Sequence, residues 1–129
     1  MADLDDWVTR RLKCSEFEIF KQIQAGVLRD IAARMASQLQ PPAIVFKPAA
    51  NANPREDNFK IVRLGSGIEA SLEFTIEGKN ICVKDGTGKQ FLAATLTLND
   101  ECECRLKVGA RELEYWQFRK LALEDFLMF

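Results

Sequence analysis

The sequence predicts an α+β protein in which a long helix packs on an antiparallel sheet, and three observations support this class. Residues 67–77 alternate strictly between apolar and polar side chains, so a strand there has one dry face and one solvated face. Residues 15–39 carry apolar side chains at helical spacing instead. From residue 43 onward, apolar segments alternate with turns that contain Gly, Asn and Asp, which is typical of a meander.

Two helices are expected before the first strand. The first covers residues 4–13 and has Asp3 as its cap. The second begins at a capping box made by Ser15 and Glu18 and runs to about residue 39. Gly26 weakens this helix by up to about 1 kcal/mol relative to alanine, and it allows close packing there. The stripe expected to cover the sheet consists of Phe17, Phe20, Ile23, Val27, Ile31 and Met35.

The expected meander has about six strands. Its first members cover residues 43–47, 59–64, 68–77, 80–84, 89–98 and 101–108. The segment 109–118 fits either a strand or the start of a helix, and we favour a last strand over residues 112–118 with a short helix from Arg119. The apolar carboxyl end then needs a surface to pack on, because burying a large apolar side chain is worth roughly 1.5–3 kcal/mol.

Length and composition indicate one domain, residues 1–129, and exclude several functions. The chain has 129 residues, of which 47% are hydrophobic and 29% charged, so it can bury a core of its own. Its net charge of −1 provides no basic excess for nucleic acid or an anionic membrane surface. No apolar run reaches the roughly 20 residues that cross a bilayer. The acidic start lacks an export signal, so we expect a cytoplasmic protein.

The chain contains no histidine, which restricts the chemistry it can perform. A Ser-His-Asp triad, a Cys-His pair and a His-bearing metal site are all excluded within one chain. Acid–base catalysis near neutral pH would require a shifted carboxylate, lysine, tyrosine or cysteine. We therefore predict no catalytic residue and no cofactor.

The four cysteines are few and irregularly spaced, so reduced thiols are expected. If residues 101–108 form a strand, Cys102 and Cys104 share one face, and paired thiolates can hold zinc or a cuprous ion or cycle as a redox pair. Leu106 and Val108 continue the same face, which favours two small core residues instead. Cys102 and Cys104 are therefore only weak candidates for metal ligands.

Three further motifs have a chemical and a structural interpretation. Residues 85–89 lack the spacing of a phosphate-binding loop and precede a strand, so we predict a hairpin turn. The basic cluster Arg10, Arg11 and Lys13 is flanked by acidic residues, which favours a solvated helix end over a nucleic-acid contact. Phe91 and Trp116 form a base-stacking platform or a protein contact on the otherwise polar face of the sheet, or they lie beneath the long helix.

The function predicted from these observations is a non-catalytic protein-interaction or binding module that self-associates. More apolar surface is present than one small sheet can cover, and a symmetric dimer would bury the excess. The interface candidates are Trp7, Trp116, Phe126 and Phe129. The alternative is a small-ligand pocket, with or without catalysis, between the long helix and the sheet, built from carboxylates, Tyr115 or Cys104. The expected partner is a second copy or another protein, and neither nucleic acid nor a membrane.

Overall fold

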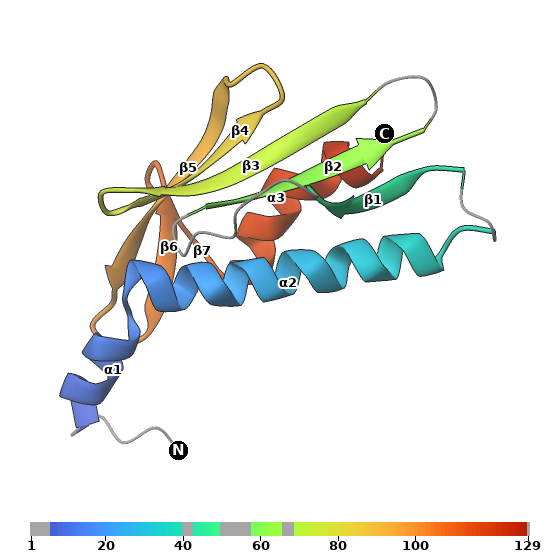
Figure 1. Cartoon of the computed structure of the whole chain (residues 1–129). Helices are drawn as coiled ribbons and strands as arrows, with labels where there is room; N and C mark the ends of the chain where they lie inside the picture. The colour runs from blue at the N-terminus through green and yellow to red at the C-terminus, as the bar shows by residue number, and fades with distance from the viewer. Residues whose placement is uncertain (1–5, 40–42, 50–57, 66–68, 129) are drawn as a thin grey trace.

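The computed structural model describes residues 6–39, 43–49, 58–65 and 69–128, and it shows helices on one face of a seven-stranded antiparallel sheet (Figure 1). The elements are α1 (Trp7–Lys13), α2 (Glu16–Ala36), β1 (Val45–Pro48), β2 (Asn58–Leu64), β3 (Ala70–Glu77), β4 (Asn80–Asp85), β5 (Gln90–Leu98), β6 (Cys104–Val108), β7 (Arg111–Leu113) and α3 (Tyr115–Leu127). The strands lie side by side in chain order. The α+β class and the meander are therefore confirmed, with seven strands where about six were expected.

The alternation in β3 decides which face of the sheet is dry, as predicted. Phe74 is fully buried and Leu72 nearly so, whereas Glu73 between them is partly exposed. The neighbouring strands continue the buried face, because Phe74 lies opposite Phe59 of β2 and Val83 of β4. The rings of Phe59 and Phe74 stack with their centroids 4.7 Å apart. The hydrophobic core thus lies between this face and the helices.

The long helix α2 begins where its sequence indicates, and most of the predicted stripe is buried, but Phe17 at its start is 48% exposed. The Oγ of Ser15 accepts a hydrogen bond from the backbone N–H of Glu18 at 3.2 Å, which is the serine half of the predicted capping box. Ile23 and Val27 are fully buried against the sheet. Of the helices that the structure describes, none combines the length and the apolar character needed to cross a bilayer.

The helix α3 packs beside α2 at Gly26, where close packing was predicted. A Cβ at that position would come within 2.6 Å of the guanidinium of Arg119. The Nε of Arg119 donates to the carboxylate of Asp30 at 2.8 Å, and the Nε of Arg34 donates to the carbonyl of Leu127 at 2.8 Å. Glycine at this position therefore lets an arginine of α3 lie across α2.

The strand predicted over residues 112–118 is wrong from Glu114 onward. It ends at Leu113, and α3 begins four residues before the helix start expected at Arg119. A reciprocal cap starts the helix: the side chain of Glu114 accepts from the backbone of Gln117, whose Oε1 accepts the N–H of Glu114 at 2.8 Å. Helical spacing then buries Phe118 in the core.

The strand predicted over residues 101–108 also starts too early. Its first residues form a turn, because the side-chain oxygen of Asn99 accepts hydrogen bonds from the backbone N–H groups of Glu101 and Glu103. Cys102 lies in this turn with a φ of 57°. It therefore does not share a strand face with the cysteine two residues later, and the expected pair of adjacent thiols is not formed.

Candidate interaction site

The short helix α1 presents apolar side chains that the described part of the chain leaves exposed. Trp7, Val8 and Leu12 are 56%, 51% and 72% exposed, and α1 contains no buried residue. At 100° per residue the three side chains fall within an arc of about 140°, which we call the apolar face of α1 and which also includes the exposed Arg11. Figure 1 shows α1 projecting beyond the first turn of α2. The predicted residues Asp3 and Leu4 lie outside the described part of the chain.

A disulfide holds the end of α1 against the sheet. Cys14, which follows the helix, is bonded to Cys104 at the start of β6, across 90 residues of sequence. The Sγ of Cys14 lies 3.7 Å from the carbonyl oxygen of Thr97 on β5. The expectation of reduced thiols is therefore wrong for these two residues, and Cys104 has no thiolate to offer a metal. Within the described residues, no group of three or more His, Cys, Asp or Glu side chains is arranged to hold an ion.

The last turn of α1 is strongly basic. Arg10, Arg11 and Lys13 all lie there, where the negative end of the helix dipole favours positive charge. Among the residues that the structure describes, none forms an ion pair with any of the three. Within the part of the chain that the structure describes, the helix thus combines an exposed apolar face with cationic groups that form no ion pair.

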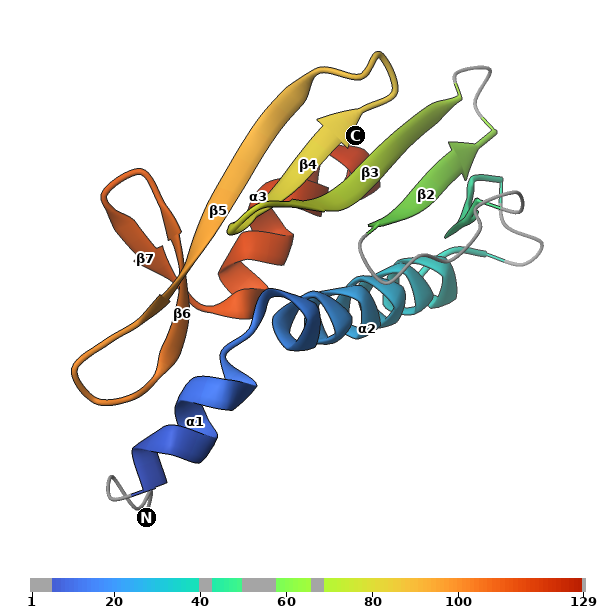
Figure 2. The same ribbon diagram turned by 60° about the vertical axis from the view of Figure 1, so that its left-hand side comes forward.

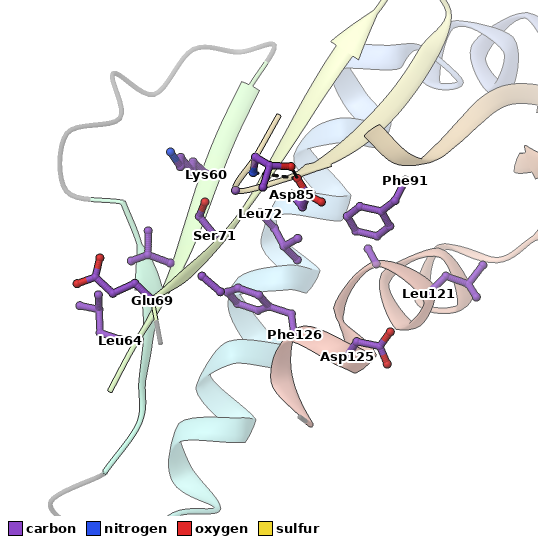
Figure 3. Close-up of a pocket in the computed structure, with 15 residues that line it drawn as sticks. Lys60, Leu64, Glu69, Ser71, Leu72, Asp85, Phe91, Leu121, Asp125 and Phe126 are labelled. Carbon is purple, nitrogen blue, oxygen red and sulfur yellow. Dashed lines mark hydrogen bonds between the residues drawn. The ribbon is translucent and has the colours of Figure 1, made fainter. Parts of the chain in front are cut away.

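A second open surface lies between α3 and the sheet, and we call it the α3 cleft (Figure 3). Its volume is about 860 Å³, and strands β2, β3 and β5, the β4–β5 turn and α3 all contribute to its lining. Leu72 and Phe126 reach toward one another inside it, and Phe91 points toward α3. Phe91 and Leu121 are 45% and 49% exposed. The cleft therefore has an apolar interior and an incompletely covered apolar rim.

The charged groups on the α3 side of the cleft are acidic. Asp125 of α3 is exposed, and Asp85 lies opposite Leu72 in the strand register. The Oδ1 of Asp85 accepts hydrogen bonds from the hydroxyl and the N–H of Thr87 and from the N–H of Lys89. These bonds, the Thr87 hydroxyl first, lower the pKa of Asp85 and keep it ionised. They also form the predicted hairpin turn.

The cleft also extends around β3, because some of its lining residues alternate to the opposite face of the strand. Glu69 and Ser71 lie on that face, as does Lys60 of β2. Lys60 is the one basic residue among those that line the cleft in the described part of the chain. The overall charge of the lining is therefore negative, with Asp85, Asp125 and Glu69 against a single lysine.

A third hollow, the α2–α3 groove, contains Trp116. Its volume is about 480 Å³, and the side chains of Leu123 and Leu127 contribute to it. Trp116 is half-exposed, and its indole N–H donates to the carboxylate of Glu114 at 2.7 Å. Two ion pairs border the groove, Asp30–Arg119 at 2.8 Å and Lys120–Glu124 at 3.2 Å. Its charges are therefore largely satisfied within the chain.

The four interface candidates from the sequence have different positions. Trp7 and Trp116 are exposed, on α1 and in the α2–α3 groove. Phe126 is buried, with its ring edge-on to Phe46 at 5.8 Å, so it packs in the core and reaches only the inside of the α3 cleft. Phe129 lies outside the described residues. The sequence did not identify Leu121 as part of the α3 cleft. The only signal for it was its position in the apolar carboxyl end of the chain.

No family model, curated protein or solved structure matches this chain. The functional proposal is therefore based on the geometry of its surfaces.

Proposed function

We propose that this protein is a non-catalytic interaction module that self-associates through α1. The observation that carries the proposal is the apolar face of α1, which is exposed although the helix is held in place by a disulfide. A helix of seven residues is too short to be stable in water by its own hydrogen bonds. Covering Trp7, Val8 and Leu12 with another surface supplies the burial that the helix lacks.

The titratable groups support binding in preference to catalysis. The ion pair between Lys84 and Glu77, at 3.0 Å, lowers the pKa of the glutamate and raises that of the lysine. Burial raises the pKa of Tyr115, and it raises the pKa of Cys82 to about 11. Each of these shifts moves a pKa away from neutrality, whereas a general acid or base works best with a pKa near the operating pH.

Light scattering coupled to gel filtration tests the proposal. We expect the intact protein to elute with at least twice its monomer mass of 14.6 kDa at about 50 µM and to dissociate on dilution. The variants Trp7→Ala and Leu12→Ala should be monomeric at the same concentration. Leu39→Ala removes an exposed leucine outside α1 and is the matched control, which should associate normally. A wild-type protein that stays monomeric at every concentration would refute the proposal.

A small-ligand site in the α3 cleft is the second candidate. Its volume lies within the roughly 300–1,000 Å³ of typical ligand sites, and its acidic rim suits a cationic apolar molecule. The predicted location differs, since the contact between α2 and the sheet contains fully buried Ile23 and Val27, and Tyr115 and Cys104 do not line the cleft. A thermal-shift screen of small amphiphilic amines tests it, with Asp125→Asn expected to abolish any stabilisation.

We further infer that the module works in an oxidising environment and not in the cytoplasm that its sequence suggested. Disulfides persist in oxidising compartments and are rare in the cytosol, and Cys14 is bonded to Cys104. Alkylating free thiols in intact cells before lysis tests the inference. Cys14 and Cys104 should remain unmodified, and their modification would contradict it.

A further inference from the structure

We infer that the α3 cleft of one copy receives the α1 helix of a second copy. This inference rests on the proposed function and names the surface that the apolar face of α1 meets. The mode of contact is a helix in a groove, in which an amphipathic helix buries its apolar face between walls of a partner. Each copy has one such helix and one such cleft, so two reciprocal contacts close a dimer about a two-fold axis.

Charge complementarity identifies the occupant as α1. Arg10, Arg11 and Lys13 lie in the last turn of the same short helix, and they have no ion-pair partner among the described residues. The α3 side of the cleft offers Asp85 and Asp125 next to apolar walls. A cationic amphipathic helix and an acidic apolar cleft are therefore matched in both properties, and opposite charges at a rim favour the correct encounter.

The apolar surfaces are also matched. Phe91 and Leu121 leave about half of their area in water at the rim of the cleft, and Leu72 and Phe126 lie further in. The large aromatic side chain of Trp7 provides the kind of anchor that dominates many interfaces when it enters such a hollow. Covering these groups would remove the largest exposed apolar side chains of both α1 and the α3 cleft at once.

The α2–α3 groove is a poorer acceptor for α1. Its acidic residues Asp30 and Glu124 already pair with Arg119 and Lys120. The remaining charged residue of its lining, Arg34, is basic and would repel the last turn of α1. The ion pairs found among the described residues include both acidic side chains of the groove but neither Asp85 nor Asp125 of the α3 cleft.

The α1 helix cannot enter the cleft of its own chain while the disulfide is intact. Its end is fixed beside Thr97, near the end of β5, whereas Phe91 lies near the start of the same strand. Six residues of extended chain separate the two positions by roughly 20 Å. A seven-residue helix is only about 10 Å long. Figure 2 shows α1 and the β4–β5 turn at opposite ends of β5. The contact is therefore between copies.

A charge-reversal experiment tests this contact with two exposed residues that the fold does not need. Arg11→Glu changes the helix and Asp125→Lys changes the cleft. We expect each single variant to raise the dimer dissociation constant at least about tenfold, because like charges then face each other. The double variant, which restores opposite charges in exchanged positions, should return to within about threefold of wild type. The constants are measured by sedimentation equilibrium at low salt.

The controls separate this inference from the function on which it rests. Lys120→Glu reverses a charge on α3 in the α2–α3 groove and should leave the dissociation constant unchanged. A dimer that Trp7→Ala dissociates, but that Asp125→Lys and Leu121→Ala leave intact, would preserve the interaction module and overturn the cleft as its acceptor. Loss of association in both single variants without recovery in the double variant would overturn it as well. A wild-type monomer would refute the proposed function itself.

Discussion

The helices α1 and α2 follow one another in the chain and both carry apolar stripes, yet only α2 is covered. Ile23 and Val27 of α2 are fully buried beneath the helix, while Trp7 and Leu12 of α1 remain largely in water. A helical stripe thus indicates that a side of the helix will be buried, but it does not say whether the cover comes from the same chain. The length of each helix and its position relative to the sheet make the difference.

The largest expected effect separates core from interface. Ile23→Ala should lower the free energy of unfolding by about 2–5 kcal/mol, because it removes a buried side chain and leaves a cavity. Leu12→Ala should change it by less than about 0.5 kcal/mol in the monomer, since that side chain is already solvated. Urea denaturation measures both values, at a protein concentration too low for the protein to self-associate.

The comparison breaks if these two substitutions have similar costs. A large loss of stability in monomeric Leu12→Ala would show that α1 packs on its own chain, and the interface argument would fail. Val8→Ala provides a second exposed position on the same helix and should behave like Leu12→Ala.

Loss of the disulfide should lower the free energy of unfolding somewhat less than the largest value expected for Ile23→Ala. Replacing both Cys14 and Cys104 by serine should cost about 2–4 kcal/mol, because the bond closes a loop of 90 residues in the unfolded chain. Trypsin should then cleave after Arg10 and Arg11 faster, since the anchor of α1 is lost. Cleavage after Arg29, within α2, is the internal control and should stay slow. Equal acceleration at both places would indicate general unfolding and not the release of α1.

Much of the sheet could be predicted because its pattern is local. Alternation in residues 68–77 assigned Leu72 and Phe74 to the core before their neighbours were known, and the side-chain cap at Ser15 marked where α2 begins. The start of α3 was harder, because Tyr115, Trp116 and Phe118 fit a strand equally well. Only the reciprocal bonds between Glu114 and Gln117 decide for a helix there.

The candidate site could be predicted only in part because it depends on distant segments. Trp7 was identified from the helical spacing of α1, but its exposure depends on where that helix lies. Cys14 and Cys104 are 90 residues apart, and the spacing of cysteines does not reveal which of them meet. The α3 cleft arises because α3 leaves Phe91 and Leu121 partly uncovered, which no local pattern encodes.

A smaller effect concerns the side of α2 that faces α3. Gly26→Ala should gain up to about 1 kcal/mol from helix propensity, but it displaces Arg119 from its ion pair with Asp30. We expect the gain to be absent in the wild-type background and to appear in Arg119→Ala, where the space is free. Thermal and urea unfolding of the four proteins forms a double-mutant cycle. Equal gains in both backgrounds would show that Arg119 does not lie across α2 in solution.

The smallest expected effect on stability concerns the two free cysteines, which should differ clearly in their rate of alkylation. Cys82 is buried and its pKa is raised to about 11, first by burial and then by the neighbouring carboxylate of Glu77. At pH 8 only about one thiol in a thousand is then ionised, so iodoacetamide should modify Cys82 far more slowly than the partly exposed Cys102. Peptide mass spectrometry follows both residues, and denaturant should make their rates similar.

The same shift predicts how alkaline pH affects stability. An unfolded cysteine ionises near pH 8.5, whereas folded Cys82 stays neutral up to about pH 11, so the unfolded state is favoured as the pH rises between these values. Cys82 lies on the face of the sheet away from the helices, opposite Thr75 of β3. Rapid labelling of Cys82 in the native protein would show that this outer face is open, and Cys82→Ala should remove its part of the pH dependence.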